Sequence, residues 1–362
     1  MWKFLPSEMM VILGLTEDAN RTDADIADIF DIKKGTVSSV RRRLLDAGAI
    51  HYSYVPAFNR LGCEMIAFHS GNSDPAIRSD TKASHYLDFC NRTPQVFFAL
   101  IGGSSVVMYT ALRNATELEA FIQHHNGFFT GTRKASKAKL TSVMFPFDLS
   151  RGTYVPQFAS LVHDYFHLDV PAPKVQPAKA AKVDPIELTK IEKSTLVNMV
   201  ATPTASDREI ASTVRLSRQA VTRIRNKFKD EGILTKTCVP RLYRWGFEIC
   251  AVAHPKFNVE VPWDKRMRSE PKRASEIAFY LLSKADEAVA SYMISKYTRY
   301  SEQLEDTLES YHKTKLLDEK PDIMVFSLER STELRTFDYS QAVKHILTPD
   351  QRPDDPIHRE NI

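Results

Sequence analysis

Residues 206–234 read SDREIASTVRLSRQAVTRIRNKFKDEGIL, and this stretch predicts a short helix and a longer one joined by a tight turn. Ser206 and Glu209 form a capping box, in which each side chain accepts a hydrogen bond from the backbone N–H of the other residue. Ser217 is suited to cap the longer helix, and Gly232 is suited to the left-handed conformation that ends one.

The longer helix has one apolar side. Val221, Ile224 and Phe228 lie at helical spacing, so this side should face a small core. A further helical pattern, over residues 188–200, precedes the stretch. Three helices with a tight turn between the last two make a helix-turn-helix, a unit whose last helix can read DNA.

The chain contains a second copy of this pattern. Residues 22–67 align without a gap with residues 206–251, and Gly48 stands opposite Gly232. Helices in this copy are expected over residues 7–17, 23–30 and 35–47. A chain of 362 residues has room for two to four domains, at about 100 to 200 residues each. The repeat accounts for this length as two copies of a two-domain unit.

Both predicted recognition helices, the last helices of the two units, are strongly basic. Residues 33–43 contain five basic and no acidic residues, and residues 215–229 contain six basic and no acidic residues. The formal charge of the whole chain is only +4, so the remainder carries a net negative charge. Cations concentrated on these two helices favour DNA binding over a merely solvated helix face.

The position of each polar residue on its helix sets its expected role. Residues near the N-terminal end of a recognition helix reach base edges in the major groove. We expect this role for Arg218, Gln219, Thr222 and Arg223 in the second copy, and for Lys34, Gly35, Ser38 and Ser39 in the first. The remaining cations are better placed for phosphates: Arg225, Lys227, Lys229, Lys33, Arg41, Arg42 and Arg43. The second copy, with two arginines among its base-edge residues, should carry more of the specificity.

Alternating strand and helix patterns follow each helix-turn-helix. In the first copy, strands are expected over residues 63–69, 96–101, 106–112 and 139–146, with helices over 82–91 and from residue 116. In the second copy, strands are expected over residues 247–253, 277–282, 289–294 and 322–328, with a helix over about 301–311. The order β-α-β-β-α-β is the ferredoxin-like arrangement, so the predicted fold class is α+β.

These patterns divide the chain into four domains. We place a helix-turn-helix domain at 1–54, a ferredoxin-like domain at 55–168, a linker rich in Pro, Ala and Lys at 169–187, a second helix-turn-helix domain at 188–238, a second ferredoxin-like domain at 239–348 and a polar tail at 349–362.

The combination resembles the Lrp/AsnC family, the leucine-responsive and feast/famine transcription regulators. The resemblance is strongest over residues 216–234, LSRQAVTRIRNKFKDEGIL, and extends through both ferredoxin-like patterns. It is looser in the first copy, where residues 32–35 read IKKG in place of an apolar residue and a serine cap. It implies a regulator that binds double-stranded DNA through two non-identical recognition helices.

The resemblance also implies partners. Members of the family pair through their ferredoxin-like domains, so we expect the two such domains of this chain to pair with each other, and further homo-oligomers remain open. Their effector domains sense a small molecule such as an amino acid beside a glycine-containing turn. Here that turn holds Gly102, Gly103, Ser104 and Ser105. A tight hairpin explains the same glycines equally well, and residues 284–287 of the second copy read KADE instead.

The composition excludes several classes of protein. The cysteines Cys63, Cys90, Cys238 and Cys250 have neither the spacing of a zinc site nor the density of a disulfide scaffold. No stretch approaches the roughly 20 apolar residues of a membrane span, and the N-terminus has no signal-peptide pattern. We therefore expect a cytoplasmic protein that binds no membrane, metal or cofactor.

Siroheme decarboxylases are an alternative, because they share the two-domain design. In them a His-rich segment leads into the second strand of the ferredoxin-like domain, and the corresponding residues 91–95 and 272–276 contain no histidine. His163 and His167 could share a metal on one helix but lack an evident third ligand. The adjacent His124 and His125 indicate nothing beyond solvent exposure. Because no catalytic motif is present, we expect that the chain is not an enzyme; a protein-binding scaffold is a further alternative.

Overall fold

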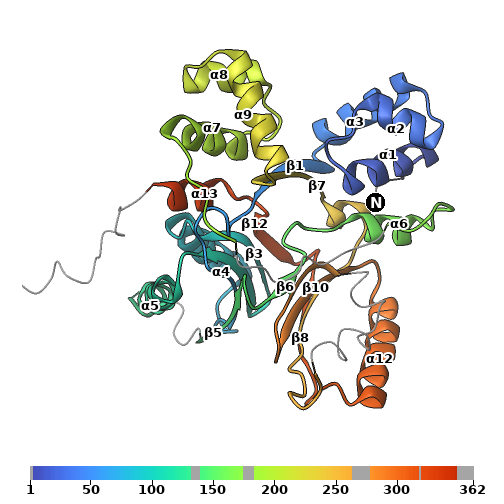
Figure 1. Cartoon of the computed structure of the whole chain (residues 1–362). Helices are drawn as coiled ribbons and strands as arrows, with labels where there is room; N and C mark the ends of the chain where they lie inside the picture. The colour runs from blue at the N-terminus through green and yellow to red at the C-terminus, as the bar shows by residue number, and fades with distance from the viewer. Residues whose placement is uncertain (1–2, 132–138, 174–182, 263–277, 318, 349–362) are drawn as a thin grey trace, which may run out of the picture.

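The structure is a computed structural model that describes residues 3–131, 139–173, 183–262, 278–317 and 319–348 (Figure 1). Two helical units lie at one end of the molecule and two β-sheets at the other, with a two-stranded ribbon between them (Figure 1). This combination confirms the predicted α+β class. None of the described helices is long and apolar enough to cross a membrane.

Both helical units are helix-turn-helix units. They consist of α1 (Pro6–Glu17), α2 (Asp23–Phe30) and α3 (Lys34–Asp46), and of α7 (Lys190–Ala201), α8 (Asp207–Val214) and α9 (Arg218–Asp230). The predicted capping box begins α8: Ser206 Oγ accepts from the N–H of Glu209 at 3.3 Å, and the Glu209 carboxylate accepts from the N–H of Ser206 at 2.7 Å. Gly48 and Gly232, just past α3 and α9, have φ of +60° and +62°, which L-residues with side chains rarely adopt.

Each half continues into an antiparallel sheet of ferredoxin-like order. The first sheet has the order β5 (Lys139–Pro146), β2 (Met65–Asn72), β4 (Ser105–Leu112), β3 (Val96–Gly102), and the second has β11 (Asp322–Ser327), β8 (Ile249–His254), β10 (Ala288–Ile294), β9 (Ala278–Ser283). Helices α4 (Ser79–Arg92) and α5 (Ala115–Gly131) pack on the outer face of the first sheet, and α12 (Tyr297–Thr314) lies on that of the second (Figure 1).

Each half also donates a strand to the sheet of the other half. β6 (Arg151–Gly152) pairs with β9, and β12 (Ser331–Thr336) pairs with β3. The chain then enters α6 (Ala159–Phe166), which packs on α1, and α13 (Ser340–Leu347), which packs on α7. The sequence does not predict this exchange, because β6 has two residues and β12 reads STELRT, without an apolar run.

The ribbon between the two ends consists of β1 (Ile50–Pro56) and β7 (Leu234–Pro240), which pair antiparallel along their whole length. β1 follows α3 and β7 follows α9, so the ribbon joins the two helix-turn-helix units. One face of the ribbon contacts the segment after β12, where Ser53 Oγ donates to the carbonyl of Phe337 at 2.6 Å. The opposite face carries Tyr52 and Tyr54 towards the recognition helices.

The inner faces of the two sheets pack against each other. The hydroxyl of Tyr109 on β4 hydrogen-bonds the hydroxyl of Ser291 on β10 at 2.8 Å, and both side chains are fully buried. The rings of Tyr109 and Tyr280 on β9 are in edge-to-face contact, with centroids 4.9 Å apart, a favoured aromatic geometry. The two ferredoxin-like domains therefore pair within one chain, as expected.

Some expectations fall on residues outside the described ranges. These are the centre of the linker, residues 174–182, the tail, residues 349–362, the segment 272–276, and Ile277 at the start of an expected strand. The domain boundaries stay predictions.

We expect Tyr280→Ala to lower the free energy of unfolding by about 3 to 5 kcal/mol, the usual cost of deleting a buried aromatic ring. Tyr280 is fully buried between the sheets, whereas Tyr297 is 63% exposed. Urea denaturation of Tyr280→Ala and of the control Tyr297→Ala measures the difference. Equal losses would show that the pairing of the sheets does not depend on this contact.

Candidate functional site

The exposed side of α9 brings together the base-edge residues predicted for the second copy. Arg218, Gln219 and Arg223 are exposed there, on a shallow surface that also includes Asn226, which the sequence reasoning missed. Asn226 follows Arg218, Thr222 and Arg223 at helical spacing, and that signal could have found it. Thr222 is half-buried and its hydroxyl donates to Asp207 at 2.6 Å, so this hydroxyl forms a contact within its own helix-turn-helix unit.

The corresponding side of α3 is exposed as well. Lys34, Ser38 and Ser39 all lie open to solvent, as does Gly35. Lys33 immediately precedes the helix and offers no side-chain cap to it, consistent with the looser match in this copy.

Four of the seven predicted phosphate-binding residues have partners within the protein. The guanidinium of Arg41 lies 2.7 Å from Asp23, and that of Arg225 lies 2.6 Å from Asp207. Two further pairs occur, one joining Lys227 and Glu192 at 2.6 Å and one joining Arg43 and Glu8. The exposed cations Lys33, Arg42 and Lys229 have no ion pair with any described residue.

The glycine turn predicted to contact an effector is the β3–β4 hairpin. Gly103 has a φ of +60°, and a Cβ on Gly102 would lie 2.2 Å from Ser331 Oγ on β12. The close approach of the donated strand therefore explains Gly102 without a ligand. Ser104 accepts two hydrogen bonds from Ser73 through its carbonyl, and Ser105 donates to Asn72.

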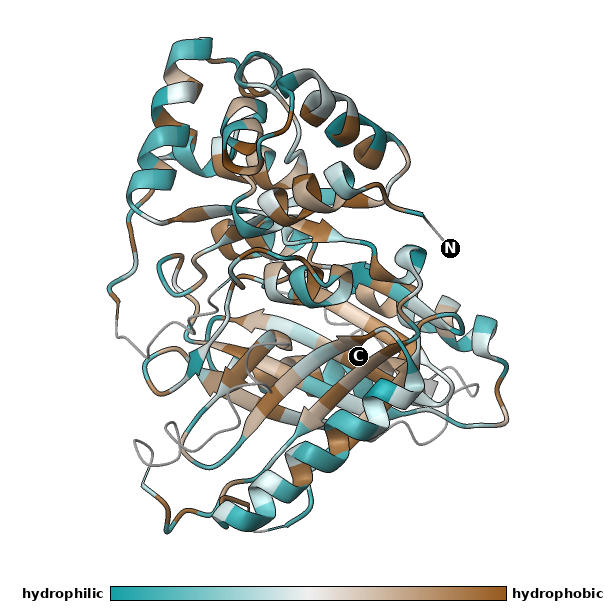
Figure 2. Cartoon of the chain, turned by 90° about the vertical axis from the view of Figure 1, so that its right-hand side faces the viewer, coloured by the Kyte–Doolittle hydropathy of each residue, from teal (hydrophilic) through white to brown (hydrophobic). Residues whose placement is uncertain are grey.

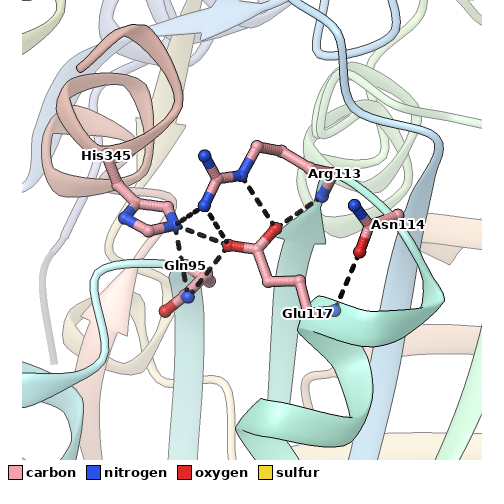
Figure 3. Close-up of polar contacts among 5 residues, drawn as sticks. All are labelled: Gln95, Arg113, Asn114, Glu117 and His345. Carbon is pink, nitrogen blue, oxygen red and sulfur yellow. Dashed lines mark hydrogen bonds and ion pairs between the residues drawn. The ribbon is translucent and has the colours of Figure 1, made fainter. Parts of the chain in front are cut away.

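A polar cluster forms where the first sheet meets α13 (Figure 3). Gln95 precedes β3, Arg113 follows β4, Glu117 lies in the first turn of α5, and His345 comes from α13 of the other half. Nε2 of His345 is 2.5 Å from Oε1 of Glu117, which also accepts from the amide of Gln95 at 3.1 Å. The second oxygen of Glu117 accepts from the backbone N–H of Arg113 at 2.6 Å.

Local structure accounts for the position of each member. Asn114 accepts from the N–H of Glu117 at 2.9 Å and thereby caps α5 (Figure 3), which places the carboxylate at the positive end of the helix. Tyr339, just before α13, stacks on Phe97 of β3 with centroids 5.0 Å apart. This contact and the β12–β3 pairing hold His345 against Gln95.

The cluster keeps Glu117 ionised and couples it to an imidazole. Burial alone would raise the pKa of Glu117, but the hydrogen bonds from His345, the Arg113 backbone and Gln95 outweigh it and lower the pKa to about 2. The side chains of Glu117 and His345 are 11% and 15% exposed, and that of Arg113 is 38% exposed. A carboxylate–imidazole pair beside an accessible guanidinium is suited to proton transfer near a bound anion.

The sequence reasoning missed His345. It looked for a histidine in residues 91–95, which lead into β3, and found none. The structure supplies a histidine to that place from α13, where Nε2 of His345 lies 3.3 Å from the amide nitrogen of Gln95. No local pattern could have indicated this, because the two residues meet only through the exchanged strand.

The second half has a counterpart of the cluster with the charges reversed. Asp164 on α6 pairs with Arg299 in the first turn of α12. The acid therefore lies on the helix after the exchanged strand, and the base lies on the helix that covers the sheet. A cavity of about 290 Å³, including its open mouth, adjoins this pair and is lined in part by Tyr165 and Phe247. The two halves thus share a geometry but not a chemistry at this position.

A larger cavity lies between α12 and the outer face of the second sheet. It measures about 620 Å³ including its open mouth, and its walls include Tyr292, Tyr300 and Gln303. The strands behind α12, on the side of the molecule that faces the viewer in Figure 2, are mostly hydrophobic. Such a wall with few polar groups is typical of a ligand pocket.

The first half fills the corresponding space with side chains. His69 of β2 stacks on Phe121 of α5 with centroids 4.3 Å apart, and its two ring nitrogens hydrogen-bond Ser142 and Thr110 at 2.8 and 2.9 Å. At the position of His69 the second half has Ala253, which is much smaller and lines the cavity. The smaller side chain leaves space there that the first half fills.

Two expectations for histidines need correction or restriction. His125 is fully buried among aromatic rings and His124 stacks on Phe89 with centroids 5.5 Å apart, so the expected solvent exposure of this pair is wrong. The reason is that α5 packs on α4 and the sheet.

His163 and His167 do not both lie within one helix. His163 is inside α6, whereas His167 is just past its end, with a φ of +50°. Among the described residues no group of three or more His, Cys, Asp or Glu side chains could hold a metal.

No protein-family model and no curated protein sequence matches this chain. Among solved structures, the siroheme decarboxylase NirDL is 14% identical over 94% of this chain and 98% of its own, with a TM-score of 0.51. NirDL in co-complex with an iron-uroporphyrin III analogue gives the same identity and coverage, with a TM-score of 0.52. AsnC from E. coli is 14% identical over 39% of this chain and 93% of its own, with a TM-score of 0.31.

The match to NirDL spans both halves and supports the duplicated fold of a helix-turn-helix followed by a ferredoxin-like domain. It also contradicts the expectation that the chain is not an enzyme, because the protein that shares the whole arrangement is one.

We expect Glu117→Gln to destabilise the protein at neutral pH, and the loss to shrink as the pH falls from 4.5 towards about 2. A carboxyl group whose pKa is lowered by folding stabilises the protein above its ordinary pKa, and that contribution disappears as the folded-state pKa is reached. Urea midpoints measured across this pH range test the change, with Glu302→Gln, an exposed position on α12, as the control. A loss independent of pH would show that the carboxylate is not held ionised by its neighbours.

Proposed function

We propose that this protein is a decarboxylase that acts on a carboxylate side chain of a siroheme-type tetrapyrrole, with His345 as proton donor. The observation that carries the proposal is the hydrogen-bonded pair of His345 and Glu117 at the start of β3, 2.5 Å apart. The resemblance to siroheme decarboxylases requires a histidine at this place, and the whole-chain likeness to NirDL supports the same reading.

Decarboxylation needs little from a protein beyond binding and one proton. The bond between the methylene carbon and the carboxylate breaks, CO2 leaves, and the electron pair remains on the methylene carbon, where the adjoining pyrrole ring delocalises it. A proton from the imidazolium of His345 then converts the methylene to a methyl group. Solvent returns the proton to His345, so the net change is uptake of one proton and release of one CO2.

The neighbours of His345 have complementary tasks. Glu117 orients the ring by accepting at Nε2, as a carboxylate partner does for a catalytic imidazole. Arg113 is accessible and can bind a second carboxylate of the substrate, which positions the reacting group. Gln95 adds a neutral donor at the same place.

The full-length protein incubated with siroheme under anaerobic, reducing conditions should release CO2 and give products lighter by one or more CO2 units in mass spectrometry. His345→Gln should slow turnover by about 100-fold or more, the usual contribution of a general acid. Lys344→Gln, an exposed neighbour on α13, is the matched control and should keep full activity. No turnover by the unchanged protein, or full turnover by His345→Gln, would overturn the proposal.

DNA binding is a second candidate function, favoured by the exposed face of α9. Arg218, Gln219 and Arg223 stand together there with no ion pair to any described residue. These side chains are of the kinds that read guanine and adenine edges in the major groove. Two such units on one chain would read an asymmetric or imperfectly palindromic site.

Selection of bound duplexes from fragmented genomic DNA tests this function. Arg218→Ala and Arg223→Ala should each reduce the preference for the selected site by about 1 to 3 kcal/mol. Lys229→Ala should weaken binding to all sequences alike and reduce the salt slope by about one. Lys229 is chosen because Lys227 pairs with Glu192. Arg330→Ala, at an exposed turn far along the chain, is the control. Equal losses on all sequences for every variant would contradict base reading.

A further inference from the structure

The β1–β7 ribbon gathers cations and hydroxyl groups from both halves of the chain. Tyr54 and Lys236 are cross-strand partners, and Tyr52 is two residues before Tyr54 on the same face. The ring of Tyr52 lies under Lys236, whose Nζ is 4.2 Å from the ring centroid. From the two recognition helices, Arg41 donates to the hydroxyl of Tyr52 at 3.0 Å and Arg225 donates to that of Tyr54.

This group of side chains has an excess of positive charge. Asp23 pairs with Arg41 and Asp207 pairs with Arg225, so each carboxylate already balances one guanidinium. Lys236 has no carboxylate within ion-pair distance among the described residues. Burial lowers the pKa of Lys236, and the charges of Arg41 and Arg225 lower it further. A half-buried ammonium between two guanidinium groups is costly without an anion.

The same group also contains hydrogen-bond donors that lack an acceptor among the described residues. Each tyrosine hydroxyl accepts from a guanidinium and keeps its own proton to donate. Neither this proton nor the ammonium of Lys236 has a hydrogen-bond acceptor within the portion of the chain that the structure describes. These three donors, from two strands, lie on the same face of the ribbon.

We propose that this face of the ribbon binds one phosphate group, with Nζ of Lys236 and the hydroxyls of Tyr52 and Tyr54 as its ligands. Phosphate offers several acceptor oxygens and a charge that balances the excess. Arg41 and Arg225 hold the hydroxyls in place and add their field. The phosphate belongs either to the backbone of a DNA duplex or to a small phosphorylated molecule, and the chemistry of recognition is the same for both.

The duplication explains why there is one site and not two. In the gapless alignment of the two copies, Lys236 is the equivalent of Tyr52. The two equivalent positions meet across the ribbon, so one supplies the ammonium and the other the ring and hydroxyl. Two lysines there would repel each other, and two tyrosines would leave no charge for the anion.

Titration of the full-length protein with inorganic phosphate, and with pyrophosphate, at constant ionic strength measures binding by calorimetry. Lys236→Met should weaken phosphate binding about ten-fold, equal to about 1.4 kcal/mol, and the double variant Tyr52→Phe, Tyr54→Phe should also weaken it. Lys313→Met on α12, where the lysine is exposed and paired with Glu309, is the control and should bind as the unchanged protein does. Circular dichroism checks that each variant is folded, and Lys236→Arg should retain binding if charge is what matters.

A second arm identifies the source of the phosphate. If the source is DNA, Lys236→Met should weaken duplex binding about ten-fold, and inorganic phosphate should compete with the duplex. If it is a small molecule, Lys236→Met should leave duplex binding unchanged while phosphate binding is weakened. Unchanged affinity of Lys236→Met for phosphate, pyrophosphate and duplex would overturn the proposal. The decarboxylase assay is independent of this outcome, since none of these residues belongs to the His345 cluster.

Discussion

The exchange of edge strands between the two halves is the constraint on which the rest of the structure depends. β6 completes the second sheet and β12 completes the first, so neither sheet leaves its β9 or β3 edge unpaired in the described part of the chain. An unpaired edge is a site of aggregation, and pairing removes it. Because α6 and α13 follow the exchanged strands, the same exchange decides which residues of one half reach the surface of the other.

The cluster around His345 follows directly from that arrangement. Gln95, Arg113 and Glu117 belong to the first half, and α13 adds an imidazole from the second. The helix-turn-helix units are tied to the same framework, since α13 packs on α7 and α6 packs on α1. A ligand bound at the cluster therefore lies one helix away from a recognition unit, and a shift of α13 would reach both.

The parts of the fold that depend on short-range chemistry were predictable. α2 begins and ends as expected and α8 begins directly after its predicted cap Ser206, because the capping residues lie within three positions of each helix start. The strands of both sheets follow from apolar runs. β6 and β12 were not predictable, because two residues or a polar hexamer carry no periodic signal, and His345 could not be found without them. The ion pairs of Arg41 and Arg225 were foreseeable in principle, since Asp23 and Asp207 recur at the same spacing in both copies.

Joining the halves in one chain has a consequence for how the molecule can change. Two separate subunits that exchange strands come apart on dilution, whereas two halves of one chain meet at a fixed effective concentration. In a symmetric dimer each substitution also appears at both equivalent positions. In this chain each substitution appears once, so equivalent positions can differ. One half has Glu117 with His345 where the other half has Arg299 with Asp164. Fusion of the two halves thus allows one position to hold a carboxylate–imidazole pair in one half and a guanidinium–carboxylate pair in the other.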